Sequence, residues 1–279
     1  MSQRLPLEPV LSLSKEGQHQ RTGEAGSAVF LVLQNLRRHP LFEFDDTPAV
    51  SSRASSSSPA CTVEWAGQSL ALLPERALWW PAERTLFIAD LHIGKAATYR
   101  ALGQPVPGGT TQENLSRIDA LIAAWSPARI VFLGDFLHAA QSRTPQVMGL
   151  LEAWRERHPD LEMTLVRGNH DSRAGDPPAA LGIAVVDEPH LLGPFACCHH
   201  PQTHPTHFVL AGHLHPACRL HGPGRDRLRM PCFVQDGEQA ILPAFGEFTG
   251  GWLMPPAPGR RFYGVGGAAV WALPERLVA

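Results

Sequence analysis

Three apolar runs of strand length alternate with two amphipathic helical patterns over residues 84–171, and this order constrains the fold more than any other feature. The runs are RTLFIAD, ARIVFLGD and LEMTLVRGNHD, and each passes directly into polar residues. Between them, residues 114–125 and 145–158 place apolar side chains at helical spacing. The alternation predicts an α/β protein, in which ligands bind at the carboxyl ends of the strands.

The first 60 residues differ in composition from the rest of the chain. They end in the run SSRASSSSP at residues 51–59, which has the composition of a flexible linker. We therefore expect residues 1–60 to be a disordered extension and residues 61–279 to form one folded domain. Hydrophobic residues make up 44% of the 279-residue chain and charged residues 18%, which suits a globular domain with a core.

Charge and cysteine content limit the partners and the compartment. The net charge is -2 with histidine neutral, so a nucleic-acid partner would have to be met by a local basic patch or through metal ions. The five cysteines show no CxxC spacing, which predicts a reducing compartment. The sequence has neither an apolar run of membrane-spanning length nor a secretory signal, so we expect a cytoplasmic protein without a membrane partner.

Two carboxylate clusters follow the first two runs. Asp90-Leu91-His92 follows the first, and Gly134-Asp135 follows the second. In an extended segment, residues two apart point to the same side, so Asp90 and His92 would present a ligand pair suited to a divalent cation. The glycine before Asp135 permits a sharp turn that projects the carboxylate from the strand end. Alone, the first cluster is more typical of a turn capped by Asp90, and Asp135 could equally cap the helix that follows.

The third run ends in Gly168-Asn169-His170-Asp171, which is a more specific pattern. Asn169 offers an amide oxygen to a metal ion, and the adjacent His170 cannot easily reach the same ion. We therefore expect His170 to transfer protons and Asp171 to orient the imidazole of His170.

Histidine clusters follow two later strands. His199 and His200 come after the apolar run PFACC, and either could be a metal ligand. His213 and His215 come after HFVLAG, and histidines at this spacing again converge on one side. A His-x-His directly after an apolar strand and a glycine is typical of a metal site.

The order DxH, GD, GNHD, H and GHxH resembles that of the calcineurin-like metallophosphoesterases. The resemblance covers residues 62–273 and implies a four-layer α/β/β/α sandwich with two divalent metal ions. It implies one metal site formed by Asp90, His92 and His215. It implies a second site formed by Asn169, His199 and His213, with Asp135 bridging both ions, His170 as the proton donor and Asp171 as its partner.

Two positions depart from the family pattern. His138 stands where the family often has an acidic residue, three positions after the aspartate of the GD motif. His200 stands where the family's histidine ligand is normally followed by glycine, so His200 remains the alternative to His199.

Longer strings resemble the bacterial ligase-associated DNA damage response endonucleases. They include LLPERALWWPAERTLFIADLHIGK, LGDFLH and LPAFGEFTGG. This resemblance implies phosphodiester hydrolysis of single-stranded or damaged DNA in DNA repair, with a DNA ligase and a helicase as pathway partners. It implies manganese as the metal, and the mixed histidine, aspartate and asparagine ligands also suit iron or zinc.

The site motifs specify a phosphate ester but not its alcohol group. One alternative is a small-molecule phosphoesterase acting on a nucleotide or cyclic nucleotide, and another is an inactive scaffold for a repair complex. Arg225, Arg227 and Arg229 alternate along GRDRLRM and would share one face of a strand. They would either bind a nucleic-acid backbone or protect an exposed strand edge by charge.

Overall fold

The computed structural model describes residues 60–104, 106, 109–221, 227–247, 249–275 and 278. All of them belong to one unit, Ala49–Ala279. The expected disordered extension over residues 1–60 lies outside the described residues except for Ala60, and so does Arg225. Within the described residues, every helix is too short or too polar to cross a membrane.

The first sheet contains seven strands that lie in the order of the chain. Its first four strands pair antiparallel, and the fourth to seventh pair parallel. The strands are β1 (Cys61–Trp65), β2 (Gln68–Leu72), β3 (Ala77–Trp80), β4 (Thr85–Ala89), β5 (Arg129–Leu133), β6 (Glu162–Val166) and β7 (Ala184–Val186). The three apolar runs of the sequence are therefore the adjacent parallel strands β4, β5 and β6.

The carboxyl ends of these three strands are level with one another. Ala89 of β4 pairs with Leu133 of β5, and Leu133 pairs with Val166 of β6. All five residues of β4 are buried, as expected for a parallel strand that is covered on both faces. The polar residues that follow each strand are consequently brought to the same edge of the sheet.

The second sheet contains nine strands drawn from the second half of the chain. Its centre is parallel, because β10 pairs with both β9 and β13 in that sense. The strands are β8 (His190–Leu192), β9 (Phe195–Cys197), β10 (Phe208–Ala211), β11 (Pro216–His221), β12 (Arg227–Gln235), β13 (Gln239–Ile241), β14 (Trp252–Leu253), β15 (Arg261–Gly266) and β16 (Ala269–Leu273). The long strand β12 pairs with β11 through its first half and with β13 and β15 through its second half.

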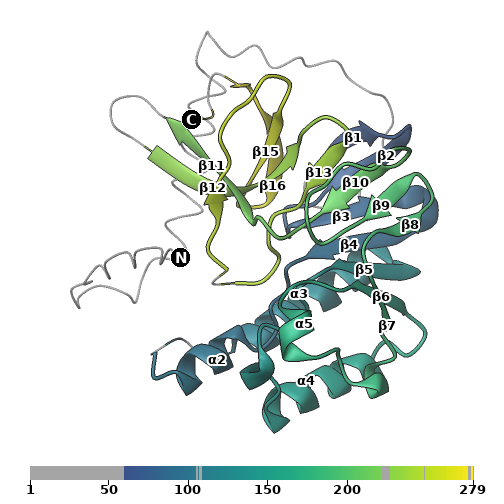
Figure 1. Ribbon diagram of the computed structural model, residues 1–279, viewed down its shortest axis with the longest axis vertical. Coiled ribbons are helices and arrows are strands. Elements are labelled where there is room, and N and C mark those ends of the chain that lie inside the picture. The colour runs from purple at the N-terminus through teal and green to yellow at the C-terminus, as the bar shows by residue number, and fades with distance from the viewer. Residues whose placement is uncertain are drawn as a thin grey trace, which may run out of the picture. The chain divides into compact units, whose positions relative to one another are not determined.

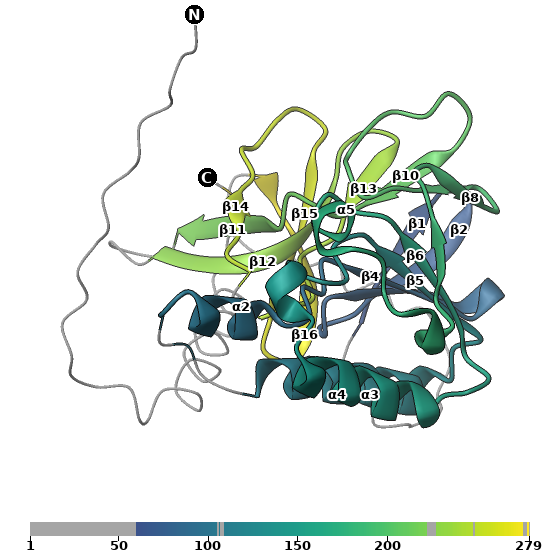
Figure 2. The same cartoon turned by 60° about the horizontal axis from the view of Figure 1, so that its bottom comes forward.

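The helices named among the described residues all lie before Gly182. They are α2 (Lys95–Ala101), α3 (Thr110–Trp125), α4 (Pro145–Glu156), α5 (Asp171–Ala174) and the 3-10 turns η1 (Pro81–Glu83), η2 (Ala140–Ser142) and η3 (Ala179–Leu181). The start of α4 is fixed by Thr144, whose hydroxyl accepts a hydrogen bond from the Val147 amide, and by Pro145 in the first turn. Figure 2 shows α3 and α4 side by side.

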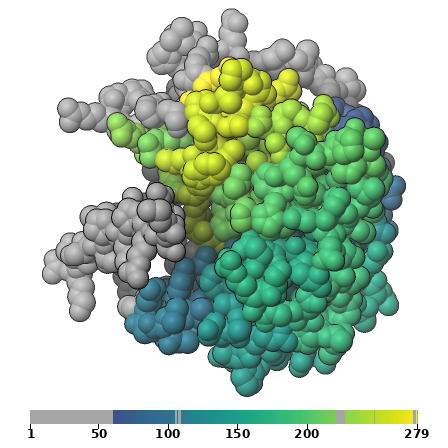
Figure 3. All heavy atoms as spheres, in the orientation of Figure 1, coloured from purple at the N-terminus to yellow at the C-terminus, as the bar shows by residue number. Residues whose placement is uncertain are grey.

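Two apolar cores lie on opposite faces of the first sheet. Leu86 and Ile88 face the cluster that contains Ile118 of α3 and Leu151 of α4. Phe87 faces the other way and packs with residues of the second sheet such as Phe195. Figure 1 shows the helices below β4 and the strands β11, β12 and β15 above it, and Figure 3 shows teal residues below and green to yellow residues above in all atoms.

The expected α/β class is confirmed. The helical layer expected over the outer face of the second sheet is not supplied by the described residues, since every helix they form lies before Gly182. That face instead carries its own apolar cluster, in which Leu220, Met230 and Phe262 are buried.

The contact between the two sheets predicts a large difference between two substitutions. Phe87→Ala removes a fully buried ring from this contact and should lower the free energy of unfolding by about 3–5 kcal/mol. Leu191→Ala changes a side chain that is 50% exposed and should alter the unfolding free energy by less than about 0.5 kcal/mol. Urea unfolding of both variants measures the difference, and equal effects would contradict a packed interface between the sheets.

Candidate metal centre

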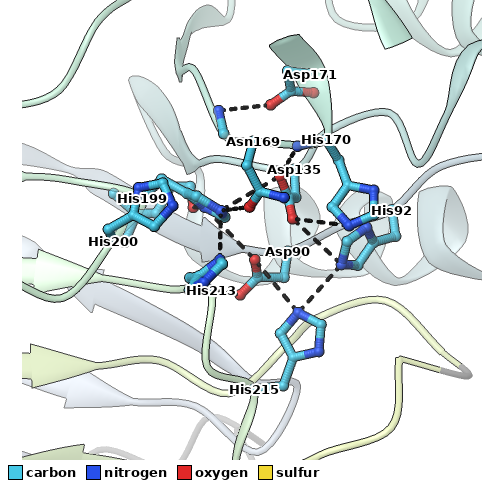
Figure 4. Close-up of polar contacts among 12 residues, drawn as sticks. Asp90, His92, Asp135, Asn169, His170, Asp171, His199, His200, His213 and His215 are labelled. Carbon is cyan, nitrogen blue, oxygen red and sulfur yellow. Dashed lines mark hydrogen bonds and ion pairs between the residues drawn. The ribbon is translucent and has the colours of Figure 1, made fainter. Parts of the chain in front are cut away.

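All seven candidate ligands from the sequence meet at the edge where the strands of both sheets end (Figure 4). The first sheet contributes side chains from the loops that follow β4, β5 and β6. The second sheet contributes side chains from the loops that follow β9 and β10. These ligands are Asp90, His92, Asp135 and Asn169 from the first sheet, and His199, His213 and His215 from the second.

The loops reach this point through left-handed backbone turns. Five of the candidate ligands have positive φ angles, namely Asp90 (53°), His92 (48°), Asp135 (51°), His213 (68°) and His215 (48°). Asp90 and His92 do converge as predicted, but the predicted cause was wrong, because the segment turns through left-handed conformations and is not extended. Non-glycine residues rarely adopt this conformation, and clusters of such residues mark sites where the surrounding structure holds the backbone in a strained form.

Three glycines make room for the clustered side chains. A Cβ atom at Gly168 would lie 2.3 Å from Asp135 Oδ1, and one at Gly134 would lie 2.1 Å from His199 Nδ1. A Cβ atom at Gly212 would lie 2.7 Å from Asp90 Oδ2. The glycines of the GD, GNHD and GHxH motifs are thus required by the close approach of the site side chains.

One group of donors consists of Asp90, His92 and His215. The two Nε2 atoms of His92 and His215 lie 3.2 Å apart. His215 Nε2 lies 3.6 Å from Asp90 Oδ1. Two nitrogens that each bind one ion at about 2.1 Å would be about 3.0–3.4 Å apart, so this spacing fits a shared ion.

A second group consists of Asn169, His199 and His213. His199 Nε2 lies 2.8 Å from Asn169 Oδ1 and 3.1 Å from His213 Nδ1. His200 also lies beside His213 and could share an ion with it and His199, while its Nδ1 atom lies 2.7 Å from Glu188 Oε1. The Nε2 atom of His199 lies close both to Asn169 and to Asp135 Oδ1, at 2.8 Å and 3.5 Å.

Asp135 lies between the two groups. Its Oδ2 atom is 3.8 Å from His92 Nε2, and its Oδ1 atom is 3.5 Å from His199 Nε2. The carboxylate is 2% exposed, and Oδ1 also accepts a hydrogen bond of 2.9 Å from the His170 amide. Each oxygen of this single carboxylate therefore faces a different group of donors.

The electrostatics of the cluster fit a divalent cation. Burial and the nearby Asp90 carboxylate raise the pKa of Asp135. Burial lowers the pKa values of His92, His199 and His213, which favours their neutral, metal-binding form. Asp90 is fully buried, and its Oδ1 atom has no hydrogen-bond partner. Because a buried carboxylate oxygen without a partner is costly, this donor set calls for positive charge.

Backbone carbonyls fix the orientation of two candidate histidine ligands. His199 Nδ1 donates a hydrogen bond to the Leu133 carbonyl at 3.2 Å, and His215 Nδ1 donates one to the Thr249 carbonyl at 3.0 Å. A carbonyl can only accept, so the hydrogen of each neutral ring is on Nδ1 and the lone pair is on Nε2. This arrangement is common around metal-binding histidines.

Asp171 does not orient the His170 ring, so that expectation is corrected. The two oxygens of Asp171 accept hydrogen bonds of 3.0 Å from the amides of Leu137 and Gly168. Its carboxyl is fully buried, and burial raises its pKa to about 6. Asp171 therefore joins the loop after β5 to the loop after β6 and shapes both of them.

The orienting group for His170 is one that sequence reasoning missed. His170 Nδ1 donates a hydrogen bond of 2.6 Å to the carbonyl of His138, and the two rings stack with their centroids 4.9 Å apart. Burial lowers the pKa of His138 to about 4, so this neighbouring ring is neutral near pH 7. His138 was visible in the sequence only as a departure three positions after Asp135, and no sequence signal points to a backbone carbonyl.

Comparisons with known proteins agree with this geometry. Residues 83–209 match the family model described as calcineurin-like phosphoesterase. The solved structure of the nuclease MPE from Pseudomonas putida is 50% identical with a TM-score of 0.68, and the match covers 77% of this chain and 100% of that one. The chain belongs to the calcineurin-like phosphoesterases. It is a metal-dependent hydrolase of phosphate esters, in keeping with the divalent metals that this family uses.

A more distant structural match is Yfce, a phosphoesterase from E. coli. It is 19% identical with a TM-score of 0.33, over 64% of this chain and 86% of that one. A comparison with curated proteins gives no match.

The glycines around the site predict a loss of metal affinity in Gly168→Ala. The added methyl group would overlap both the carboxylate and the backbone nitrogen of Asp135, so Asp135 must move. We expect metal affinity to fall by at least about tenfold, measured by titration calorimetry and by elemental analysis. Gly149→Ala in α4 is the control, because a Cβ atom there meets nothing within 4 Å. Equal metal binding by both variants would contradict the close approach at Gly168.

Proposed function

We propose that the chain is a two-metal phosphodiesterase that cleaves DNA, with its catalytic domain in residues 61–279. In this proposal one cation is held by Asp90, His92 and His215. The other is held by Asn169, His199 and His213, and Asp135 contacts both.

The observation that carries the proposal is the position of the Asp135 carboxylate. One of its oxygens faces the group with His92, and the other faces the group with His199. A carboxylate that is shared in this way holds two cations close together, which is the arrangement of two-metal hydrolases. The short distances from His199 Nε2 to Asn169 Oδ1 (2.8 Å) and to Asp135 Oδ1 (3.5 Å) support His199 as the ligand over His200.

The bound cations would supply a water molecule of lowered pKa and positive charge beside the phosphate oxygens. The leaving oxygen of the ester needs a proton, and His170 supplies it. Because its Nδ1 hydrogen is held by the His138 carbonyl, the ring gains a second proton only at Nε2. Nε2 lies on the site side, 3.9 Å from Asp135 Oδ2, and the side chain is 30% exposed. A proton on Nε2 can therefore pass to the leaving oxygen of the ester.

Manganese is the metal we propose, with iron and zinc as the alternatives. The donor set mixes imidazole nitrogens with carboxylate and amide oxygens. This mixture suits these metals better than magnesium, which prefers oxygen ligands.

The proposed substrate is single-stranded or damaged DNA. The 50% identity to a protein described as a nuclease supports a nucleic-acid substrate. Participation in DNA repair beside a ligase and a helicase belongs to the same proposal and rests on the sequence resemblance. The cytoplasmic location that we propose rests on the cysteine spacing and the apolar pattern of the sequence.

An assay with two substrates tests the proposal. In the presence of manganese, the purified protein should cleave both bis(p-nitrophenyl) phosphate and a labelled single-stranded DNA. Asp135→Asn should be inactive on both and should bind less metal, because it removes the charge shared by the two groups. Cleavage of the small ester alone would leave the phosphodiesterase chemistry and replace DNA by a nucleotide-type substrate. Absence of cleavage by a protein that binds two metal ions would indicate a scaffold.

Substitution of the proton donor separates catalysis from metal binding. His170→Ala should keep the metal content of the wild type and lose about 10²–10⁴-fold in kcat on esters with poor leaving groups, such as DNA. Its activity on bis(p-nitrophenyl) phosphate should fall much less, because p-nitrophenolate leaves without a proton. An unchanged kcat on DNA would remove His170 from the mechanism.

A further inference from the structure

Strands β11 and β12 form a two-stranded ribbon with arginines on one face. Arg219 of β11 lies directly opposite Arg229 of β12 in the antiparallel register. Arg227 lies two residues before Arg229 and therefore points to the same side of the ribbon. We call the surface made by Arg219, Arg227 and Arg229 the arginine face. The opposite face carries the buried residues Leu220 and Met230.

The positive charges of the arginine face are not balanced by carboxylates within the part of the chain that the structure describes. No ion pair is formed there by any of the three guanidinium groups. Arg227 and Arg229 are exposed, and Arg219 is partly exposed. Like charges directly opposite one another destabilise a ribbon. One charged side chain would protect a strand edge, so an opposed pair of arginines indicates a surface built for an anionic partner.

The arginine face is continuous with the metal centre. A cavity of about 190 Å³ is lined by His215 and Arg229 together with Thr249, Gly250 and Gly251. None of its lining residues is acidic. Its other arginine, Arg76, is already paired with Glu247.

One short loop holds both the candidate ligand and the ribbon in place. The Thr249 carbonyl accepts the hydrogen bond from His215 Nδ1, and the Gly251 carbonyl accepts one from Arg229. The amide of Trp252 also donates to the His215 carbonyl at 3.0 Å. A polyanion bound at His215 would therefore meet Arg229 first and the rest of the arginine face beyond it.

We infer that the arginine face binds the phosphate backbone of the DNA strand that flanks the cleaved phosphate on the His215 side. This inference rests on the proposed function and adds the path that the strand takes from the metal centre. Guanidinium groups suit phosphate oxygens because they offer several donors in one plane. Contacts of this kind hold the strand without reading its sequence.

The test uses a double substitution in the full chain, Arg219→Gln with Arg227→Gln. Arg229 is left in place because it holds the Gly251 carbonyl of the loop beside His215. The control is Arg129→Gln with Arg157→Gln, which removes the same charge. Arg129 begins β5, at the end of the sheet remote from the site, and Arg157 follows α4. Each of these two arginines pairs with a carboxylate.

The measured quantities are kcat and KM on single-stranded DNA over a series of salt concentrations, and the rate on bis(p-nitrophenyl) phosphate. If each arginine neutralises one phosphate, the double variant should raise KM for DNA about 25-fold at 0.1 M salt. The slope of log KM against log salt should fall by about 1.4. The small ester is too short to reach the ribbon, so its hydrolysis should follow the control variant.

The outcomes separate this inference from the proposed function. A double variant whose KM and salt dependence on DNA match those of the control overturns the role of the arginine face and leaves the nuclease proposal standing. An equal loss on DNA and on the small ester also overturns it, because that result indicates damage to the metal centre. A wild-type protein that cleaves the small ester and not DNA overturns the nuclease proposal itself, and the inference with it.

Discussion

The site is organised by two carboxylates buried beside one another, Asp90 and Asp135. Neither is exposed enough for water to offset its charge, and burial together with their mutual repulsion raises the pKa of Asp135. Burial lowers the pKa values of the His92 and His199 imidazoles, so these rings are neutral and offer lone pairs in place of positive charge. Such an arrangement is unfavourable without positive charge, and the left-handed turns and close glycine contacts of the loops hold the donor atoms together at this place. The free energy of metal binding is thus also free energy of folding at this edge.

The register of the sheets determines where these carboxylates lie. Because β4, β5 and β6 end level, the loops that follow them begin at one edge, and the face-to-face packing around Phe87 brings the ends of β9 and β10 to the same edge. The loops then interlock through the side chain of Asp171, which bonds the amides of Leu137 and Gly168. A carboxylate that was expected to act on a catalytic ring therefore acts on backbone geometry, and the ring takes its orientation from the carbonyl of His138.

Much of this arrangement could be predicted from the sequence, since apolar runs and helical spacing report burial directly. The strands β4 to β6 and the helix α4 were predicted close to their observed bounds, whereas α3 begins at Thr110, four residues before the predicted start. The helix α2 was not predicted, because KAATYRA carries little apolar periodicity. Contacts made by backbone atoms could not be predicted either, since a carbonyl carries no residue signature. The left-handed turns at Asp90 and His92 are a further case, because they depend on the loops that surround them.

The division of the site between two sheets has a consequence for the chain as it is synthesised. The first four candidate ligands lie before residue 170, but the last two, His213 and His215, lie beyond β10. A nascent chain that has released only its first sheet from the ribosome carries two of the three donors of the group with His92 and one of the three of the group with His199, and so does a fragment cut between β7 and β9. Neither donor group is complete in such a chain. The full set of donors is therefore brought together only when the second sheet packs against the first.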